Sequence, residues 1–130
     1  MHEYSLAYSL LHGLLEHLET QPTGGRILRV HVRQGELLML SQSALREAWR
    51  ILAADTPLAG AELVTESVPV TVRCPACGYQ GDARYLTEHG WHQTIPILAC
   101  PQCGGRVQIV AGRDLAIVGL TVEEEGGDPT

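Results

Sequence analysis

The chain has 130 residues, of which 45% are apolar, and this suits one globular domain or one domain with a small insert. Its formal net charge is −6, with nine basic against fifteen acidic residues, which argues against a nucleic-acid binder because such proteins usually present a basic surface. No apolar run approaches the length of about 18 residues that a membrane-spanning helix needs, and the N-terminus lacks the pattern of a signal peptide, so we expect a cytoplasmic protein without membrane contact.

The first element is predicted to be an amphipathic helix. Leucines recur at spacings of three and four residues from Leu6 to Leu18, which places them on one face of a helix. His12 and His17 fall off this stripe, and we expect both to be solvated. Residues 21–25, Gln-Pro-Thr-Gly-Gly, should end the helix.

Residues 26–33 are predicted to form a strand with one buried face and one basic, solvated face. Three apolar and three basic side chains alternate there with a period of two. The apolar set is Leu28, Val30 and Val32, and the basic set is Arg29, His31 and Arg33.

A second helix is predicted to follow, capped by Ser41 or Ser43. Its inner face should carry Leu45, Ala48, Trp49, Ile51 and Leu52. After an exit turn at residues 55–60, residues 61–72 read as a long strand with a break at Pro69, and this strand runs directly into the first cysteine.

The four cysteines of the chain form two Cys-x-x-Cys-Gly motifs. They are Cys74, Cys77, Cys100 and Cys103, and 22 residues separate the two pairs. The glycine after each pair lets the chain turn so that backbone N–H groups face the sulfurs. Two such turns predict a closed four-thiolate site for a structural Zn(II) ion. Two disulfides or a redox dithiol are the alternatives, but disulfides need an oxidising compartment and a dithiol site leaves the second pair unexplained.

Two further strands are predicted at residues 107–110 and 115–122, separated by a turn at 111–114. The order of elements predicts an α+β fold, with two helices packed on a small mixed β-sheet and a four-cysteine zinc ribbon inserted between the penultimate and last strands. We expect residues 1–68 plus 111–130 to form the α+β domain and residues 69–110 to form the zinc-ribbon domain.

The N-terminus is a second candidate metal site. The α-amine of Met1, the deprotonated backbone nitrogen of His2 and its imidazole can chelate one ion in fused rings. A fourth donor can be the backbone nitrogen or carboxylate of Glu3, or another side chain. Nitrogen donors in a near-planar arrangement suit Ni(II) and Cu(II). The alternative is a histidine that is simply solvated near a chain end.

Seven short motifs occur in a fixed order along the chain. They are residues 1–6 (Met-His-Glu-Tyr-Ser-Leu), 34–37 (Gln-Gly-Glu-Leu), 60–63 (Gly-Ala-Glu-Leu), 68–69 (Val-Pro), 74–78 (Cys-Pro-Ala-Cys-Gly), 100–104 (Cys-Pro-Gln-Cys-Gly) and 111–115 (Ala-Gly-Arg-Asp-Leu). Together they resemble the HypA/HybF family of nickel metallochaperones for [NiFe]-hydrogenase maturation. The resemblance covers essentially the whole chain, and the Met-His-Glu start combined with two Cys-x-x-Cys-Gly pairs is its most specific part.

The resemblance implies a protein that is not an enzyme. Ni(II), a transient cargo, would be held at the positions matching Met1, His2 and Glu3, and structural Zn(II) by the four cysteines. The implied partners are the precursor of the hydrogenase large subunit and a nickel-insertion GTPase, with urease maturation served by some members. We expect no nucleic-acid or membrane partner, and a monomer or weak homodimer.

One stretch departs from the family pattern. Residues 35–41 read Gly-Glu-Leu-Leu-Met-Leu-Ser, so Ser41 stands where the family often has an acidic residue near the nickel site, and serine is a poor nickel ligand. His89 and His92 lie between the cysteine pairs and are expected to be solvated. The alternative function is a zinc-ribbon module that binds protein or nucleic acid without delivering nickel. A hydrolytic zinc enzyme is disfavoured, because four thiolates leave no open position for water.

Overall fold

The computed structural model describes residues 2–86 and 97–123, which fold as two compact units. The described part of the first, here the helical unit, comprises residues 2–33, 40–66 and 115–123; that of the second, here the ribbon unit, comprises residues 34–39, 67–86 and 97–114. The segment 34–39 groups with the ribbon unit through its contacts, although it lies between two elements of the helical unit in the sequence. The predicted boundaries of a nickel domain and a zinc domain remain a prediction.

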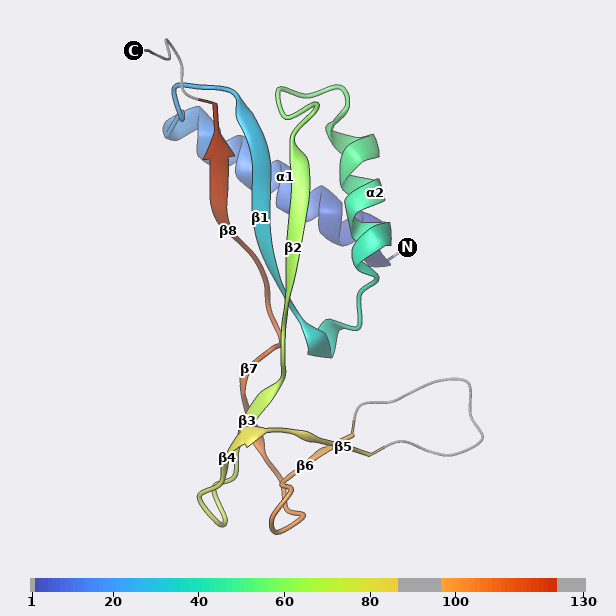
Figure 1. Cartoon of the computed structure of the whole chain (residues 1–130), viewed down its shortest axis with the longest axis vertical. Helices are drawn as coiled ribbons and strands as arrows, with labels where there is room; N and C mark the ends of the chain where they lie inside the picture. The colour runs from blue at the N-terminus through green and yellow to red at the C-terminus, as the bar shows by residue number, and fades with distance from the viewer. Residues whose placement is uncertain (1, 87–96, 124–130) are drawn as a thin grey trace. The chain divides into compact units, whose positions relative to one another are not determined.

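The helical unit has two helices on one face of a three-stranded sheet (Figure 1). Its elements are α1 (His2–Thr20), β1 (Ile27–Gly35), α2 (Gln42–Ala53), β2 (Glu62–Val68) and β8 (Leu115–Val122). The sheet has the order β2-β1-β8, so β8 and β2 are its edges. In Figure 1, β1 and β2 run in the same direction and β8 runs against them. The predicted α+β fold with a small mixed sheet is therefore confirmed.

The core of the helical unit lies between the helices and the sheet. Trp49 of α2 is its largest fully buried side chain, and its indole Nε1 donates to the carbonyl oxygen of Ala61 at 3.1 Å. The other core side chains are almost all aliphatic, as a chain without phenylalanine requires. Ala7, Leu11 and Leu14 come from α1, Ile27, Val30 and Val32 from β1, and Leu45, Ala48 and Ala53 from α2.

The α2 helix begins with a side-chain cap. Ser41 is in the extended region of backbone space, and its hydroxyl oxygen accepts a hydrogen bond from the backbone N–H of Ala44 at 3.1 Å. This satisfies one of the N–H groups that the first turn of a helix leaves without a partner. Of the two serines predicted as the cap, Ser41 is therefore the N-cap of α2. The Ser43 hydroxyl contacts the Ser41 hydroxyl.

Three predicted side-chain positions were wrong. Ile51 was expected on the inner face of α2 but is 54% exposed. In β1 the core takes Ile27 rather than Leu28, because the strict alternation begins only at Val30. His31 was expected to be solvated; it is half-buried, and its Nε2 lies 2.7 Å from the Thr121 hydroxyl of β8, since the neighbouring edge strand shields this face.

The ribbon unit is built from short pieces. They are η1 (Glu36–Leu38), β3 (Thr71–Arg73), β4 (Gln80–Asp82), β5 (Arg84–Leu86), β6 (Ile97–Ala99) and β7 (Gln108–Ala111). Strands β4, β3 and β7 form one antiparallel sheet, and β5 pairs antiparallel with β6. The long strand predicted over residues 61–72 with a break at Pro69 is present as β2 and β3, and β7 matches the strand predicted after the last cysteine. Strands β4, β5 and β6 were not predicted, because three residues are too few to show a period.

Backbone segments of the ribbon unit meet closely at two glycines. The N–H of Leu37 donates to the carbonyl oxygen of Gly112 at 3.0 Å. A Cβ added to Gly35 would lie 2.2 Å from that same oxygen, and one added to Gly112 would lie 2.6 Å from the carbonyl oxygen of Pro69. The segment around η1 is thereby held against the turn that precedes β8. Among the residues that the structure describes, no helix is both long and apolar enough to cross a membrane.

Candidate metal centre

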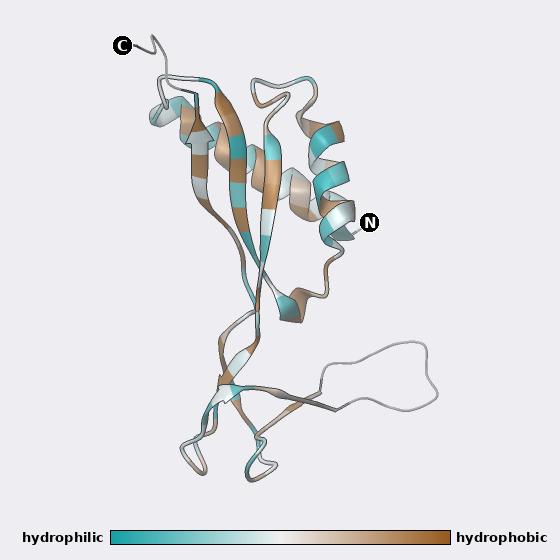
Figure 2. Ribbon diagram, in the orientation of Figure 1, coloured by the Kyte–Doolittle hydropathy of each residue, from teal (hydrophilic) through white to brown (hydrophobic). Residues whose placement is uncertain are grey.

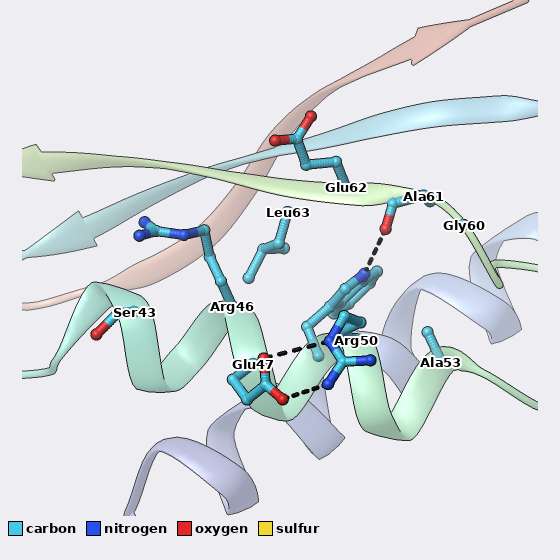
Figure 3. A pocket seen from close by; sticks show the side chains of 10 residues that line it. Ser43, Arg46, Glu47, Arg50, Ala53, Gly60, Ala61, Glu62 and Leu63 are labelled. Carbon is cyan, nitrogen blue, oxygen red and sulfur yellow. Dashed lines mark hydrogen bonds and ion pairs between the residues drawn. The ribbon is translucent and has the colours of Figure 1, made fainter.

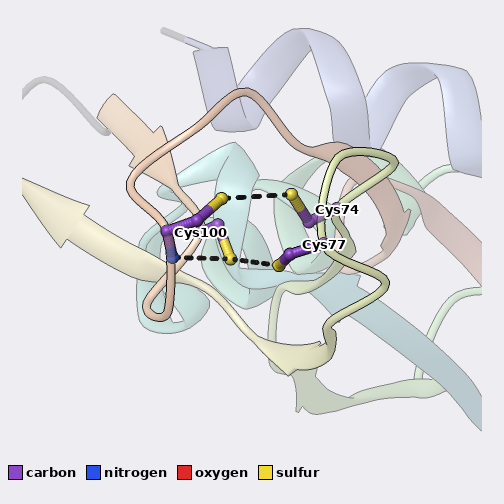
Figure 4. Close-up of side chains that lie close together, drawn as sticks. Cys74, Cys77 and Cys100 are labelled. Carbon is purple, nitrogen blue, oxygen red and sulfur yellow. Dashed lines mark hydrogen bonds between the residues drawn. The ribbon is translucent and has the colours of Figure 1, made fainter.

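The four cysteine side chains converge on one point in the ribbon unit (Figure 4). Their sulfur atoms all lie within 4.8 Å of one another. The sulfurs of Cys74 and Cys103 are 3.6 Å apart, and those of Cys77 and Cys100 are 3.5 Å apart. The fold thus brings together two motifs that are separated by 22 residues in the sequence.

Each Cys-x-x-Cys-Gly motif folds into the same tight turn. The N–H of Gly78 donates to the carbonyl of Cys74 at 2.8 Å, and the N–H of Gly104 donates to that of Cys100 at 2.9 Å. Both glycines have a positive φ, 82° and 75°, which a residue with a Cβ adopts only with strain. The predicted role of the glycines in these turns is confirmed.

The turns aim backbone N–H groups at the first sulfur of each pair. In the second motif the N–H groups of Gln102 and Cys103 both donate to the Cys100 sulfur at 3.4 Å. Burial raises the pKa of the Cys100 thiol, but these two N–H groups and the neighbouring thiols outweigh it and bring the pKa to about 7. In the first motif the N–H of Cys77 is the main cause that lowers the pKa of the Cys74 thiol.

The pKa of the second thiol of each pair is raised rather than lowered. The N–H of Tyr79 lowers the pKa of the Cys77 thiol, but the neighbouring sulfurs and burial outweigh it and raise the pKa to about 12. The pKa of the Cys103 thiol is raised too. The Gly105 N–H lowers this pKa, but the Cys74 sulfur and burial raise it by more. Without an ion the centre cannot hold four thiolates side by side, so a cation that binds there must displace protons.

The donor set fits Zn(II). A tetrahedral ion with Zn–S bonds of about 2.3 Å separates its sulfurs by about 3.8 Å, and the separations of 3.6 Å between Cys74 and Cys103 and 3.5 Å between Cys77 and Cys100 are close to this. A disulfide holds its sulfurs about 2.05 Å apart, and all four cysteines are free. Four soft donors in a closed arrangement leave no position for substrate or water, so the site is structural in kind.

Of the N-terminal candidate residues, the structure describes His2 and Glu3, which lie in the helical unit, in the first turn of α1. The helix begins at His2, whose side chain is exposed, and Glu3 is partly buried. One carboxylate oxygen of Glu3 accepts a hydrogen bond from the backbone N–H of Ser41 at 2.9 Å. This bond, and one from its own backbone N–H, lower the pKa of the Glu3 carboxyl.

The helical start leaves the backbone nitrogen of His2 available. The first four N–H groups of an α-helix have no acceptor within that helix. A metal that takes the deprotonated His2 nitrogen therefore breaks no intrahelical hydrogen bond. The family resemblance placed position 41 near the N-terminal site, but it did not predict a hydrogen bond between Ser41 and Glu3. These residues are 38 positions apart, and the packing of α1 against α2 brings them together.

The remaining candidate residues lie away from these centres or outside the described residues. Met1, His89 and His92 lie outside the described residues. His12 and His17 of α1 are exposed as predicted, and the ring of His12 lies against that of Tyr8, with centroids 4.1 Å apart. Among the described residues the four cysteines form the one group of three or more side chains that can hold a metal ion.

Comparison with known proteins points in one direction. A family model described as "Hydrogenase/urease nickel incorporation, metallochaperone, hypA" matches residues 1–122. The chain is 34% identical over 125 residues to the "Hydrogenase maturation factor HypA" of Desulfosudis oleivorans, an alignment that covers 95% of this chain and 100% of that protein. It is 38% identical over 122 residues to the protein of the same name from Chloroflexus aurantiacus, covering 92% of this chain and 97% of that protein.

A solved structure has the same fold. The solution structure of the Ni metallochaperone HypA from Helicobacter pylori matches with a TM-score of 0.62, over 95% of this chain and 98% of that chain. The two sequences are 23% identical, so this likeness concerns the fold.

Proposed function

The chain belongs to the HypA family of hydrogenase/urease nickel incorporation metallochaperones, and from this premise we propose that it binds Ni(II) at its N-terminus and delivers the ion to the large subunit of a [NiFe]-hydrogenase. The family's members are metallochaperones and not enzymes. The observation that carries the proposal is the position of His2 at the exposed start of α1, where the backbone nitrogen has no intrahelical partner.

The proposed nickel ligands are the Met1 amine, the backbone nitrogen and imidazole of His2, and one donor from Glu3. One carboxylate oxygen of Glu3 accepts the Ser41 N–H, and the Glu3 backbone N–H donates to the same carboxylate. We assign the Glu3 contribution to its backbone nitrogen, because a fourth nitrogen donor completes the near-planar set that Ni(II) prefers. Like that of His2, this nitrogen lies in the first turn of the helix. Four nitrogen donors suit Ni(II) better than Zn(II), which does not readily displace amide protons.

An exposed site suits a protein that must release its cargo. Ligands on one chain end bind without a surrounding cage, so a receiving protein can approach the ion and replace them one at a time. The amine, the amide nitrogens and the imidazole bind metal only when deprotonated. Nickel affinity should therefore fall as the pH is lowered.

The proposed zinc ligands are Cys74, Cys77, Cys100 and Cys103. Their separations fit one tetrahedral ion, and among the described residues of the ribbon unit only Val70, Val72 and Ala99 are buried apolar side chains besides the cysteines. The bound ion would hold the two Cys-x-x-Cys-Gly turns together and so fix the strands that enter them. We place the protein in the cytoplasm, because free thiols at such a site need a reducing compartment.

The implied partners follow from the cargo. The large-subunit precursor would receive the ion, and a nickel-insertion GTPase would act with the chain in loading or release. Pulldown of the precursor by nickel-loaded wild-type chain, and a weaker pulldown by the His2→Ala variant, would support delivery. Equal capture by both would show that docking does not depend on nickel.

The first experiment is a nickel titration by calorimetry on protein with a native, untagged N-terminus. Wild type is compared with His2→Ala, and His12→Ala serves as the matched control, because His12 is another exposed histidine of α1. Metal content is read by mass spectrometry. We expect one nickel ion in wild type and His12→Ala, none at this site in His2→Ala, and one zinc ion in all three.

Two outcomes would overturn parts of the proposal. Equal nickel binding by wild type and His2→Ala would remove the N-terminal site. Loss of nickel in Glu3→Gln, which keeps the backbone nitrogen, would assign the Glu3 contribution to the carboxylate instead.

A further inference from the structure

A groove in the helical unit lies between helix α2 and the beginning of strand β2 (Figure 3). Its volume is about 430 Å³, within the range of about 300–1,000 Å³ that is usual for ligand-binding clefts. One wall consists of α2 side chains and the other of residues 60–63. Neither the cysteines nor the N-terminal candidate residues line it, so the two metal sites give this groove no role.

The strand wall of the groove is the edge of a sheet. Among the described residues, β1 is the one strand that pairs with β2. The carbonyl of Ala61, just before β2, is directed to α2, where the indole Nε1 of Trp49 donates to it at 3.1 Å. Backbone groups of every second residue point to the same side of a strand, so those of Leu63 and Thr65 also point away from β1. Such groups are the ones that an added strand can bind.

The two acidic side chains of β2 do not close this edge. Glu62 pairs with Arg29 of β1, with an N–O distance of 3.6 Å. Glu66 pairs with Arg33 of β1, with an N–O distance of 3.4 Å. An added strand would therefore meet balanced charges on this face rather than two carboxylates without partners.

The helix wall supplies an arginine that has no acidic partner. Figure 3 shows Arg46 reaching from α2 toward β2, whereas Arg50 and Glu47 face each other as an ion pair. Arg46 donates to the Thr65 hydroxyl at 3.2 Å. In the described part of the helical unit, the other four arginines each form an ion pair and Arg46 does not. The groove thus contains one positive charge that is not balanced.

The kind of occupant follows from these two walls. Figure 2 shows teal bands on both α2 and β2, so a purely apolar segment would leave polar groups of the groove without partners. A helix could not bind the backbone groups of the strand edge, whereas an extended segment can. A carboxylate on that segment would give Arg46 the acidic partner that it lacks.

We propose that this groove binds an extended, acidic segment of a partner protein, which adds to β2 as a fourth strand of the sheet. Its backbone pairs with that of Leu63 and Thr65. Its side chains alternate between the two faces of the sheet, so every second one enters the groove. An acidic side chain among these binds the guanidinium of Arg46.

A different protein is favoured over a second copy of the chain. Pairing of two β2 strands would bring Glu62 and Glu66 of both copies together on one face of a joint sheet, and like charges on neighbouring strands are destabilising. It would also supply no carboxylate on the groove side, where Leu63 and Thr65 lie. The proposal concerns docking and needs no metal ion, so its failure and the failure of nickel delivery are separate results.

The test is an NMR titration of the zinc-loaded full-length chain with the end-blocked peptide Thr-Val-Thr-Glu-Thr-Val-Thr. We expect the amide signals of residues 61–66 to shift, and the amide protons of Leu63 and Thr65 to exchange more slowly with solvent. The same peptide with glutamine in place of glutamate should bind about three- to fivefold more weakly, as the loss of one exposed ion pair predicts. A peptide that is N-methylated on two consecutive central residues should not bind, because one of the two lost N–H groups faces the edge.

Variants of the chain assign the charge preference to one residue. Arg46→Gln should bind the glutamate and glutamine peptides equally. The double variant Glu47→Gln/Arg50→Gln is the matched control, because it removes a balanced pair from the same groove, and it should keep the preference for glutamate. Arg46→Glu should prefer a peptide with lysine at the central position.

Four outcomes would overturn the proposal. The first is the absence of shifts at residues 61–66 up to the solubility limit of the peptide. The second is equal binding of the N-methylated peptide, and the third is a preference for glutamate that persists in Arg46→Gln. The fourth is an equal response to free glutamate, which would make the groove a site for small carboxylates rather than for a strand.

Discussion

The carboxylate of Glu3 accepts a hydrogen bond from the backbone N–H of Ser41, with 2.9 Å between oxygen and nitrogen. Glu3 lies in the first turn of α1, and Ser41 is the residue that caps α2. A negative charge is therefore held between the N-terminal ends of two helices, where both helix dipoles favour it. The bond fixes the residue next to His2, so the proposed nickel site is built on an anchored chain end.

This bond predicts how Glu3 titrates. The hydrogen bond stabilises the ionised carboxylate, so the pKa of Glu3 in the folded protein lies below its ordinary value of 4.5. A group with a depressed pKa stabilises the fold above the pKa of the unfolded chain, and this contribution is lost as the pH falls through the lower, folded value. The Ser41 amide signal in NMR should therefore shift with a midpoint below pH 4.5. In Glu3→Gln that shift should vanish; if it stayed, another acid would be its source.

A second prediction concerns the cap itself. Ser41→Ala removes the hydroxyl that accepts the Ala44 N–H but keeps the backbone N–H that Glu3 binds. We expect the free energy of unfolding of the helical unit to drop by about 1 kcal/mol, measured by urea denaturation. Ser43→Ala is the matched control, because its hydroxyl contacts only that of Ser41. Nickel stoichiometry should not change in either variant, whereas a loss in Ser41→Ala would show that the hydroxyl takes part in the site.

The sequence predicted those parts of the fold that repeat with a period. The leucine stripe of α1 is long enough to indicate a helix. The almost entirely apolar segment of β8 is long enough to indicate a strand. Positions at the ends of elements were less predictable. Ile51 sits on the side of α2 that the core does not reach, and this depends on how the helix is rotated against the sheet. The period of apolar residues predicts which side of a helix faces the core, but not how many residues on that side are buried.

Some features of the candidate sites could be predicted from the sequence, and others could not. The cysteines were predictable because their ligand spacing is local and the two halves are alike. The resemblance placed position 41 near Glu3, but the hydrogen bond between them was not predictable, since it depends on a main-chain N–H, which every residue except proline has. The three-residue strands of the ribbon unit were equally hidden. Their positions follow from where the two cysteine turns meet rather than from any alternation of side chains.

Removal of zinc gives a third prediction. Among the residues that the structure describes, the ribbon unit has no apolar core comparable with that of the helical unit, so we expect a strong chelator to unfold it and to leave the helical unit intact. Trp49 is 1% exposed in the helical unit and reports on it by fluorescence. Replacing Trp91 by Phe makes Trp49 the single tryptophan.

After chelation in this variant, Trp49 emission should keep its wavelength, while the amide NMR signals of residues 71–82 lose their dispersion. Addition of zinc should restore them. A red shift of Trp49 emission on chelation would contradict the independence of the two units.

The last prediction tests the close backbone approach at Gly112. Its φ is +96°, and an added Cβ would lie 2.6 Å from both the Pro69 carbonyl oxygen and the Val70 Cα. Backbone atoms cannot move aside as a flexible side chain can. Gly112→Ala therefore combines the strain of a positive φ with a clash, and we expect it to lower the free energy of unfolding of the ribbon unit by about 3 kcal/mol or more.

Gly60 supplies the matched control for Gly112. Its φ is +86°, almost the same, but an added Cβ would meet nothing within 4 Å. Gly60→Ala should therefore lower the free energy of unfolding by only about 1 kcal/mol, the strain alone. Urea denaturation followed by the amide NMR signals of each unit measures both effects separately. Equal losses in the two variants would mean that backbone strain alone sets the loss at Gly112, and that the strands around it can separate to admit a methyl group.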